Sequence, residues 1–235
     1  MTATVAPART ELGSSVKAPA LVSAGLFVLS LLIGLVAAGK VYASPFVADG
    51  VSAAFFADHA AAIQWVALCQ FGSAITLVVA TAAIGGRLRA LAPGFPSLTA
   101  LALAGGVVSA ALLALNSVVQ WALSHPAVTQ DPATRRALHY LFFGLGGFAH
   151  VASVGLLVAS VSLIGLRAGL LPRWFNLVSL VVAALAVLSP LTFVTESVTA
   201  LIPLGRFPTL VWLVAIGFLL PDNMVRSASS AHPRS

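Results

Sequence analysis

Two histidines bound one of the most apolar stretches of the sequence, HYLFFGLGGFAH, which runs from His139 to His150. An α-helix has about 3.6 residues per turn, so this spacing corresponds to about three turns and places both side chains on one helix face. Imidazole exchanges protons near neutral pH and binds haem iron. In an apolar helix, such a pair indicates either hydrogen bonds to neighbouring helices or a site for a ligand.

Further polar side chains stand within other apolar stretches of the chain. Asn116 and Gln120 are one helical turn apart, and Gln70 lies in the apolar stretch that begins at His59. Polar residues inside a membrane are costly and usually face the interior of a helix bundle or a cavity. They also form hydrogen-bonded contacts between helices, and the sequence leaves both roles open. The candidate ligand-binding residues are His59, Gln70, Asn116, Gln120, His139 and His150.

Carboxylates near these residues would allow acid–base chemistry. Asp58 precedes His59, and Glu196 follows a long apolar stretch. A carboxylate assisted by a histidine can act as a general acid or base, here on a lipid or isoprenoid, so the catalytic candidates are Asp58, Glu196 and His139. Alternatively, His59 and His139 would ligate a noncovalent haem b. The sequence has no His-Glu-x-x-His pair and no glycine-rich phosphate loop, so no other metal or nucleotide site is predicted.

The composition is that of a membrane protein. Hydrophobic residues make up 60% of the chain and charged residues 8%, and the mean hydropathy is +1.04. Soluble domains average about 25% charged residues, so this chain cannot cover a globule with polar surface. Helices satisfy their own backbone hydrogen bonds in lipid, and the long unbroken apolar runs do not match the alternation of a β-barrel. We predict an all-α, polytopic membrane helix bundle.

Six apolar runs separated by proline and glycine predict six transmembrane helices. They cover residues 20–42, 59–84, 98–122, 137–165, 174–195 and 207–220. The last run is shorter than the roughly 20 residues that a span needs. The predicted transmembrane domain covers residues 19–221, and the tails 1–18 and 222–235 are predicted to be disordered and cytoplasmic.

The distribution of Lys and Arg predicts the orientation of these spans. With the N-terminus inside, the inner side receives Arg9, Lys17, Arg87, Arg89, Arg167, Arg173, Arg226 and Arg234. The outer side receives Lys40, Arg135, Arg136 and Arg206. This bias predicts a protein of the cell membrane with both termini in the cytoplasm. Because the net charge of +6 is spread over many loops, nucleic-acid binding is not predicted.

The second and third spans resemble the fourth and fifth. Two segments align without gaps, residues 57–91 and 137–171. The alignment places His59 opposite His139 and Gln70 opposite His150. It predicts a parallel repeat related by an axis along the membrane normal, with a polar stripe at the same depth in each copy.

His150 is expected near the middle of its span, where a protonated ring would be costly. No Asp or Glu lies at that depth in the predicted spans. We therefore expect a neutral ring that binds a neighbouring helix through one ring nitrogen. The candidate partners are Gln70, Ser73, Ser109, Asn116 and Ser153. The glycines nearby, Gly144, Gly146 and Gly147, are expected to allow close helix packing.

Three segments carry a resemblance to a known family, namely FFADHAAAIQWVALCQFGSAITLVVATAAIGGRLR, LIGLRAGLLPRWFNLVSLVVAALAVLSPL and FPTLVWLVAIGFLL. The chain is similar to a family of uncharacterised bacterial multi-pass membrane proteins known only as a domain of unknown function. The resemblance spans about residues 20–220, and its most specific part is the turn from Gly169 to Trp174. It implies a bacterial membrane protein, but no reaction and no catalytic residue.

Three functions follow from these observations. The leading hypothesis is the binding or passage of a small apolar or amphipathic molecule, or service as a membrane partner subunit, with the polar stripes lining a cavity that opens outward. The first alternative is a membrane-embedded enzyme in which Asp58 or Glu196 works with His139 or His150 near the outer leaflet. The second is a haem-binding redox subunit. The expected partners are membrane lipids and a small hydrophobic ligand.

Overall fold

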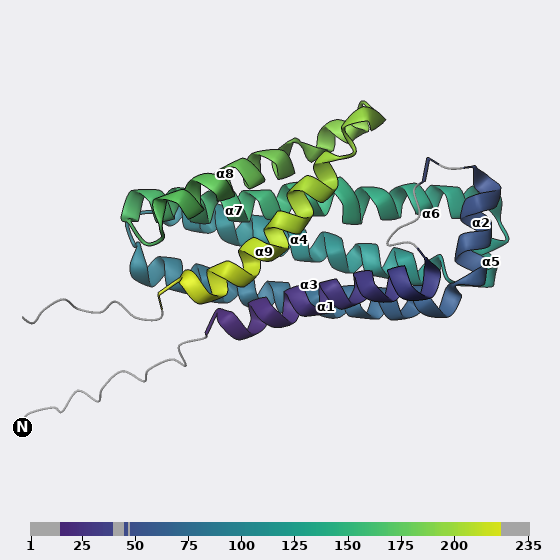
Figure 1. Ribbon diagram of the computed structural model, residues 1–235, viewed down its shortest axis with the longest axis horizontal. Coiled ribbons are helices and arrows are strands. Elements are labelled where there is room, and N and C mark those ends of the chain that lie inside the picture. Colours follow the sequence, from purple (N-terminus) through teal and green to yellow (C-terminus); the bar gives the residue numbers. More distant parts are fainter. Residues whose placement is uncertain (1–14, 40–44, 47, 222–235) are drawn as a thin grey trace, which may run out of the picture.

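The computed structural model of the chain describes residues 15–39, 45–46 and 48–221, and within these ranges the chain forms helices and turns but no strand (Figure 1). Six helical segments in this part are long and apolar enough to cross a membrane. The prediction of an all-α membrane helix bundle is confirmed, and the chain is a multi-pass integral membrane protein. The first helix begins at Lys17, and most of the two predicted tails lies outside the described residues.

The candidate spans comprise the long helices and the turns continuous with them. Three spans are single helices, α1 (Lys17–Ala38), α3 (Ala60–Leu91) and α4 (Pro96–Ala122). The fourth joins α6 (Pro132–Gly144), η1 (Leu145–Ala149) and α7 (His150–Ala168). The fifth joins α8 (Arg173–Leu188) to η2 (Ser189–Phe193), and the sixth joins η3 (Glu196–Val198) to α9 (Leu201–Leu219). Two short helices, α2 (Asp49–Asp58) and α5 (Pro126–Thr129), connect spans.

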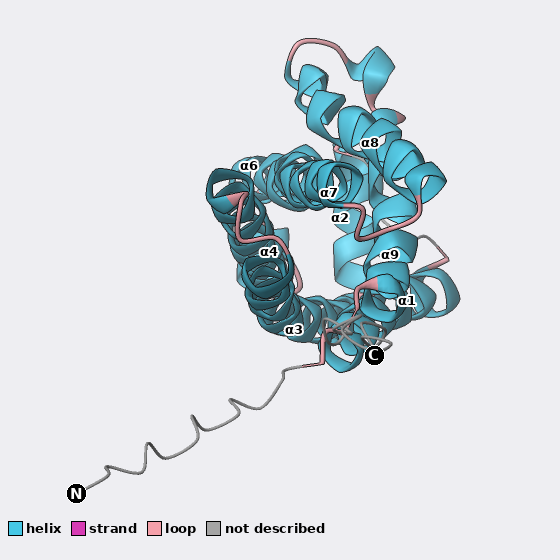
Figure 2. Cartoon of the chain, turned by 90° about the vertical axis from the view of Figure 1, so that its left-hand side faces the viewer, coloured by secondary structure: helices cyan, strands magenta, loops and turns pink. Residues whose placement is uncertain are grey.

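The long helices pack in a ring. α3 packs between α1 and α4, α7 packs between α4 and α8, and α9 contacts both α8 and α1. Figure 2 shows this ring end-on, with α9 between α1 and α8. The described chain begins and ends at one end of the bundle, called the terminal end below. α2 and α5 lie at the opposite end, called the α2–α5 end (Figure 1).

Local sequence explains where several helices begin and end. Pro96 and Pro132 stand in the first turn of α4 and α6, where the missing N–H is not needed. The Asp131 side chain caps α6 by accepting a hydrogen bond from the Ala133 N–H at 3.2 Å. The Thr134 hydroxyl also donates to this carboxylate and holds the pKa of Asp131 below its usual value. Gly169 ends α7 in the left-handed conformation, with φ of 66°.

The packed interior and the outer surface are both apolar. The largest cluster of buried side chains lies toward the terminal end and includes Leu77, Ile84, Leu157, Ile164 and Ile216. Large apolar side chains also cover the outside, as with Val36 at 84% and Val211 at 70% exposure. A surface that faces lipid needs no polar cover, so this distribution fits the membrane bundle.

The sixth span differs from its prediction. The expected run, residues 207–220, begins too late, because α9 starts at Leu201 and the span at Glu196. Arg206 therefore lies inside the span and is only 8% exposed, so its assignment to the outer side as a loop residue is wrong. Apolar residues before Arg206 extend the helix, and α9 also accommodates Pro208 in its interior.

The fourth span is interrupted where the sequence predicts a continuous helix. Residues 145–149 form a π-helical turn, in which Gly147 has φ of −75° and ψ of −106°. The His150 N–H donates to the carbonyl oxygens of Leu145 and Gly147, so it bypasses Gly146. A Cβ atom on Gly146 would lie 2.3 Å from Asn116 Oδ1, which confirms the expected close packing at this glycine. The turn therefore offers the Gly146 carbonyl to a neighbouring helix.

Candidate functional site

A cavity of about 390 Å³ lies between α1, α3, α4, α6, η1 and α9. Its polar lining consists chiefly of Gln70, Asn116 and Arg206. Aromatic side chains form much of the remaining wall, namely Phe27, Phe142, Phe143 and Phe207. Binding sites for small molecules are mostly apolar with a few convergent polar groups, and this lining has that character.

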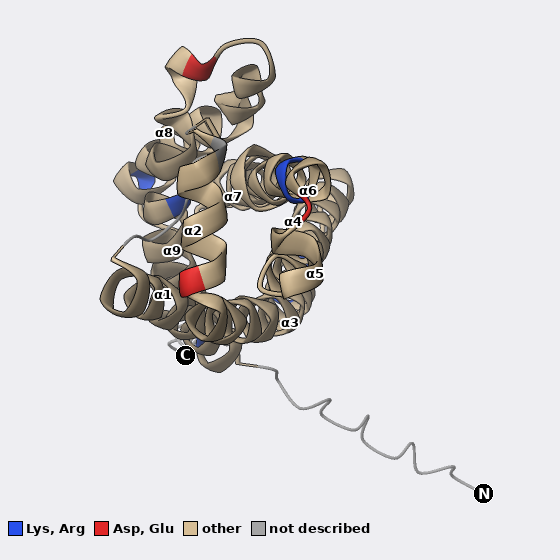
Figure 3. Ribbon diagram, turned by 90° about the vertical axis from the view of Figure 1, so that its right-hand side faces the viewer, with Lys and Arg blue, Asp and Glu red and all other residues tan. Residues whose placement is uncertain are grey.

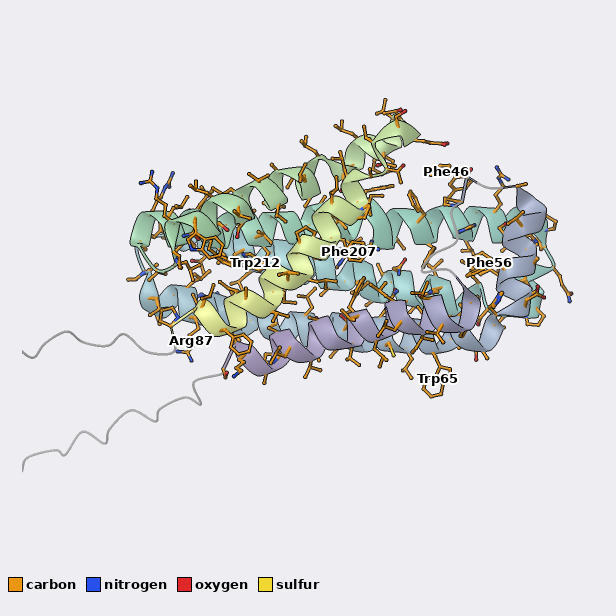
Figure 4. All side chains as sticks on the ribbon, in the orientation of Figure 1. Phe46, Phe56, Trp65, Arg87, Phe207 and Trp212 are labelled. Carbon is orange, nitrogen blue, oxygen red and sulfur yellow. The ribbon has the colours of Figure 1, made fainter. Side chains whose placement is uncertain are left out.

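Two helix packings bring the lining residues together. α3 and α4 lie side by side along their length, so Gln70 and Asn116 meet inside the bundle. α9 crosses the other helices obliquely, and Phe207 lies where it passes in front of them (Figure 4). Arg206 precedes Phe207 on this helix, so the oblique crossing also carries the guanidinium to the cavity.

Gln70 and Asn116 form a buried amide pair. Asn116 Nδ2 donates to Gln70 Oε1 at 3.0 Å, and the two residues are 2% and 1% exposed respectively. The Asn116 amide lies directly against Gly146 of the π-helical turn. The sequence predicted both polar residues as facing the interior of the bundle, and their burial confirms that orientation.

Arg206 is the residue of the cavity that the sequence analysis missed. Its Nη2 donates to the Gly146 carbonyl oxygen, and its Cζ lies 5.7 Å from the centre of the Phe27 ring. The short last run was the sequence feature that could have revealed it. A run of 14 residues (207–220) is too short to span, since about 20 are needed, and extending it toward the N-terminus would have included Arg206.

His150 forms the interhelical contact that its depth predicted. Its Nδ1 lies 3.0 Å from the Ser109 carbonyl oxygen and 2.8 Å from the Ser109 hydroxyl. The same hydroxyl donates to the His150 carbonyl oxygen at 3.1 Å. Because a carbonyl oxygen can only accept, the proton lies on Nδ1. The expected bond through one ring nitrogen to Ser109 of a neighbouring helix is confirmed, and His150 does not belong to the described cavity lining.

Three further ligand-binding candidates lie outside that lining. His139 is 3% exposed, and its ring packs edge-on against Phe56 with centroids 5.0 Å apart. His59 Nδ1 donates to the Phe55 carbonyl oxygen at 2.9 Å, which leaves Nε2 as the nitrogen that a metal would use. Gln120 is 6% exposed and lies one turn beyond the amide pair on α4. Ligation of haem by His59 and His139 stays a prediction.

The carboxylates considered for catalysis lie at the surface. Asp58 and Glu196 are both exposed, and neither belongs to the described lining of the cavity. Figure 3 shows the molecule from the α2–α5 end, where charged residues occupy only a few helical turns. Within the described ranges, no group of three or more His, Cys, Asp or Glu residues is arranged to hold a metal ion. A catalytic role for Asp58, Glu196 or His139 stays a prediction.

The chain matches no protein family model, no curated protein and no solved structure. Its resemblance to a family of bacterial multi-pass membrane proteins therefore stays a prediction. The function has to be inferred from the cavity and from the residues that line it.

Proposed function

We propose that this integral membrane protein binds a small amphipathic molecule in the cavity beneath α9. The observation that carries the proposal is the lining, which joins aromatic walls to a compact polar group of Gln70, Asn116 and Arg206. Apolar walls favour the hydrocarbon part of a ligand, and convergent polar groups fix the orientation of its head.

The size of the cavity favours a single small ligand. Ligand sites in proteins occupy about 300–1,000 Å³, and a volume of about 390 Å³ lies at the lower end of this range. This volume suits a short single-chain amphiphile better than a two-chain phospholipid. Bulk lipid would then contact the outer faces of the helices, whereas the ligand would enter between them.

Binding is favoured over acid–base catalysis by the chemistry of the lining. The described lining contains no carboxylate and no histidine, the groups that most often transfer protons in enzymes. The glutamine and asparagine amides donate and accept hydrogen bonds without changing protonation state. Such groups recognise a molecule and do not transform it.

The proposal includes a location in a bacterial cell membrane, with both termini in the cytoplasm and the cavity nearer the outer surface. Four described arginines lie at the terminal end, namely Arg87 and Arg89 near the end of α3, Arg167 in the last turn of α7 and Arg173 at the start of α8. Arg135 and Arg136 belong to α6 at the α2–α5 end. Arg206 lies inside a span and no longer counts among the outer loop residues. The excess of Lys and Arg on the inner side is therefore larger, which supports this orientation.

Two neighbouring positions on α9 allow a matched test of the cavity. Pro203 belongs to the lining, whereas Leu204 is 52% exposed and does not. The probe is a dodecanol analogue that carries a diazirine at the end of its chain, with labelled peptides mapped by mass spectrometry. Pro203→Trp should weaken labelling of α6 and α9 by about tenfold, because overpacking a site costs roughly 1–3 kcal/mol. Leu204→Trp should leave the labelling at the wild-type level.

The distribution of the label separates cavity binding from contact with bulk lipid. Labels concentrated on peptides that contain Phe142 or Phe207 would support the proposal. Equal labelling of the two tryptophan variants, spread over lipid-facing residues such as Val36 and Val211, would contradict it.

A further inference from the structure

We infer that the ligand is a monoanionic amphiphile, with a carboxylate head that Arg206 binds and a chain that lies among the phenylalanines. This inference rests on the proposed function and assigns a chemical class to the ligand of the same cavity. It follows from the position of Arg206, the charge of the lining, the fixed geometry around Gly146 and the aromatic walls.

Arg206 presents a full positive charge inside a membrane span. It belongs to the cavity lining and is only 8% exposed. An ionised side chain in a span is costly, and such residues usually mark a path or site for a ligand. It donates to the Gly146 carbonyl oxygen and lies near the Phe27 ring, which holds the guanidinium at the wall of the cavity. An anion in the cavity would experience the charge of Arg206 at low dielectric, where attraction is stronger than in water.

The charge of the lining sets the charge of the ligand. Arg206 is the one charged residue among the described residues that line the cavity. A carboxylate head would bring one negative charge to this single cation. A phosphate monoester carries about −1.5 to −2 charges at neutral pH and would leave excess negative charge in an apolar site. The lining therefore favours a carboxylate over a phosphate monoester.

The neighbouring residues hold the guanidinium in place for this role. Arg206 donates to the carbonyl oxygen of Gly146, and Gly146 packs against the Asn116 amide. Asn116 is itself fixed by its hydrogen bond to Gln70. The amide pair therefore acts as a positioning element, because it fixes the carbonyl to which the cation is anchored. A preorganised charge binds a head group without the cost of ordering a flexible arginine.

The aromatic walls supply the site for the hydrocarbon chain. Phe142 and Phe143 lie on α6, and Phe207 follows Arg206 directly on α9. A head bound at Arg206 would thus lie close to an apolar surface that the chain can cover. Burial of hydrocarbon contributes about 0.8 kcal/mol per methylene, so chain and head would act together.

Competition between head groups tests the inference in the intact protein. The labelled dodecanol analogue is displaced by unlabelled dodecanoate, dodecanol or dodecyl phosphate, at alkaline pH where the carboxylic acid is ionised. In the wild-type protein, dodecanoate should compete at concentrations at least about tenfold lower than dodecanol, as expected for one charge-assisted hydrogen bond. Dodecyl phosphate should compete less well than dodecanoate.

Variants assign the head-group preference to one residue. Arg206→Gln should abolish the advantage of dodecanoate while dodecanol still binds, and Arg206→Lys should keep part of it. Arg135→Gln is the matched control, because Arg135 is 5% exposed but does not belong to the described lining. This control should keep the full preference. The wild-type comparison decides the question even where a variant fails to fold.

The outcomes distinguish failure of this inference from failure of the proposed function. Equal competition by dodecanoate and dodecanol, with the label still in the cavity, would overturn the anionic head and leave cavity binding intact. Stronger competition by dodecyl phosphate would overturn the choice of a carboxylate. A preference for dodecanoate that persists in Arg206→Gln would remove the role of Arg206. Absence of label from the cavity would overturn both proposals.

Discussion

A buried hydrogen bond between Ser109 and His150 joins α4 to α7. The ring nitrogen donates to one backbone, and the serine hydroxyl donates to the other, so each helix supplies both a donor and an acceptor. His150 was expected to bind a neighbouring helix through one ring nitrogen, and its contact with Ser109 confirms this expectation. The neutral state of the ring stays a prediction. Arg206 was missed because the prolines near it indicated a loop, although the short last apolar run pointed to a longer span that would include it.

The prediction at this scale concerns substitution of His150. Glutamine can still donate from a side-chain amide, so His150→Gln should be tolerated. His150→Leu should lower the free energy of unfolding by about 1–2 kcal/mol, the size of one interhelical hydrogen bond. Ser109→Ala is the matched change on the partner helix, and adding it to His150→Leu should cost little more than either alone. Denaturant unfolding in detergent measures these values.

Loss of ligand labelling in a folded His150→Gln protein would contradict the structural role of this histidine. It would instead extend the binding site from the cavity to the α4–α7 contact. Additive destabilisation by His150→Leu and Ser109→Ala would also show that the two residues do not act through one shared bond.

The π-helical turn in the fourth span connects the fold to the cavity. The Gly146 carbonyl oxygen in this turn accepts a hydrogen bond from Arg206 of α9, and Gly146 and Gly147 both line the cavity. The sequence predicted this span and the close packing of its glycines, because hydropathy and residue size are local properties. It could not predict the turn itself, because the three glycines fit a regular helix equally well and the packing of Gly146 against Asn116 joins distant parts of the sequence.

Gly146 gives the prediction at the scale of the element. A Cβ atom there would lie 2.3 Å from Asn116 Oδ1, so Gly146→Ala should destabilise the protein by about 1–3 kcal/mol. Gly86 is the matched control, because it lies exposed in α3 and a Cβ atom there meets nothing within 4 Å. Gly86→Ala should be neutral or slightly stabilising, since alanine favours helix over glycine by about 1 kcal/mol. Thermal unfolding of the two variants measures the difference, and equal stability would refute the close contact.

At the scale of the whole molecule, hydropathy predicted the number of spans but not their neighbours. Apolar side chains cover the lipid-facing surface as well as the interior, so composition cannot say which helices touch. The predicted repeat is compatible with α3 and the fourth span running in the same direction (Figure 1). However, a repeat of spans two and three as spans four and five would give Gln70 and His150 different partner spans. Both residues instead form hydrogen bonds to α4, the third span. The cavity itself arises from the oblique path of α9, which no local pattern encodes.

Protection of a cysteine in the cavity tests the account most directly, because it examines the outward opening and the occupant together. Thr199 belongs to the lining, and Thr199→Cys is introduced into a Cys69→Ala background in intact cells. A membrane-impermeant maleimide applied outside should modify Cys at this position, and dodecanoate should slow the modification at least about tenfold more effectively than dodecanol. Ala127→Cys at the α2–α5 end should react with or without dodecanoate, and Ser97→Cys at the terminal end should not react from outside. Modification of position 199 only from the cytoplasmic side, or at a rate that dodecanoate does not change, would contradict an outward-opening cavity that binds an amphipathic carboxylate.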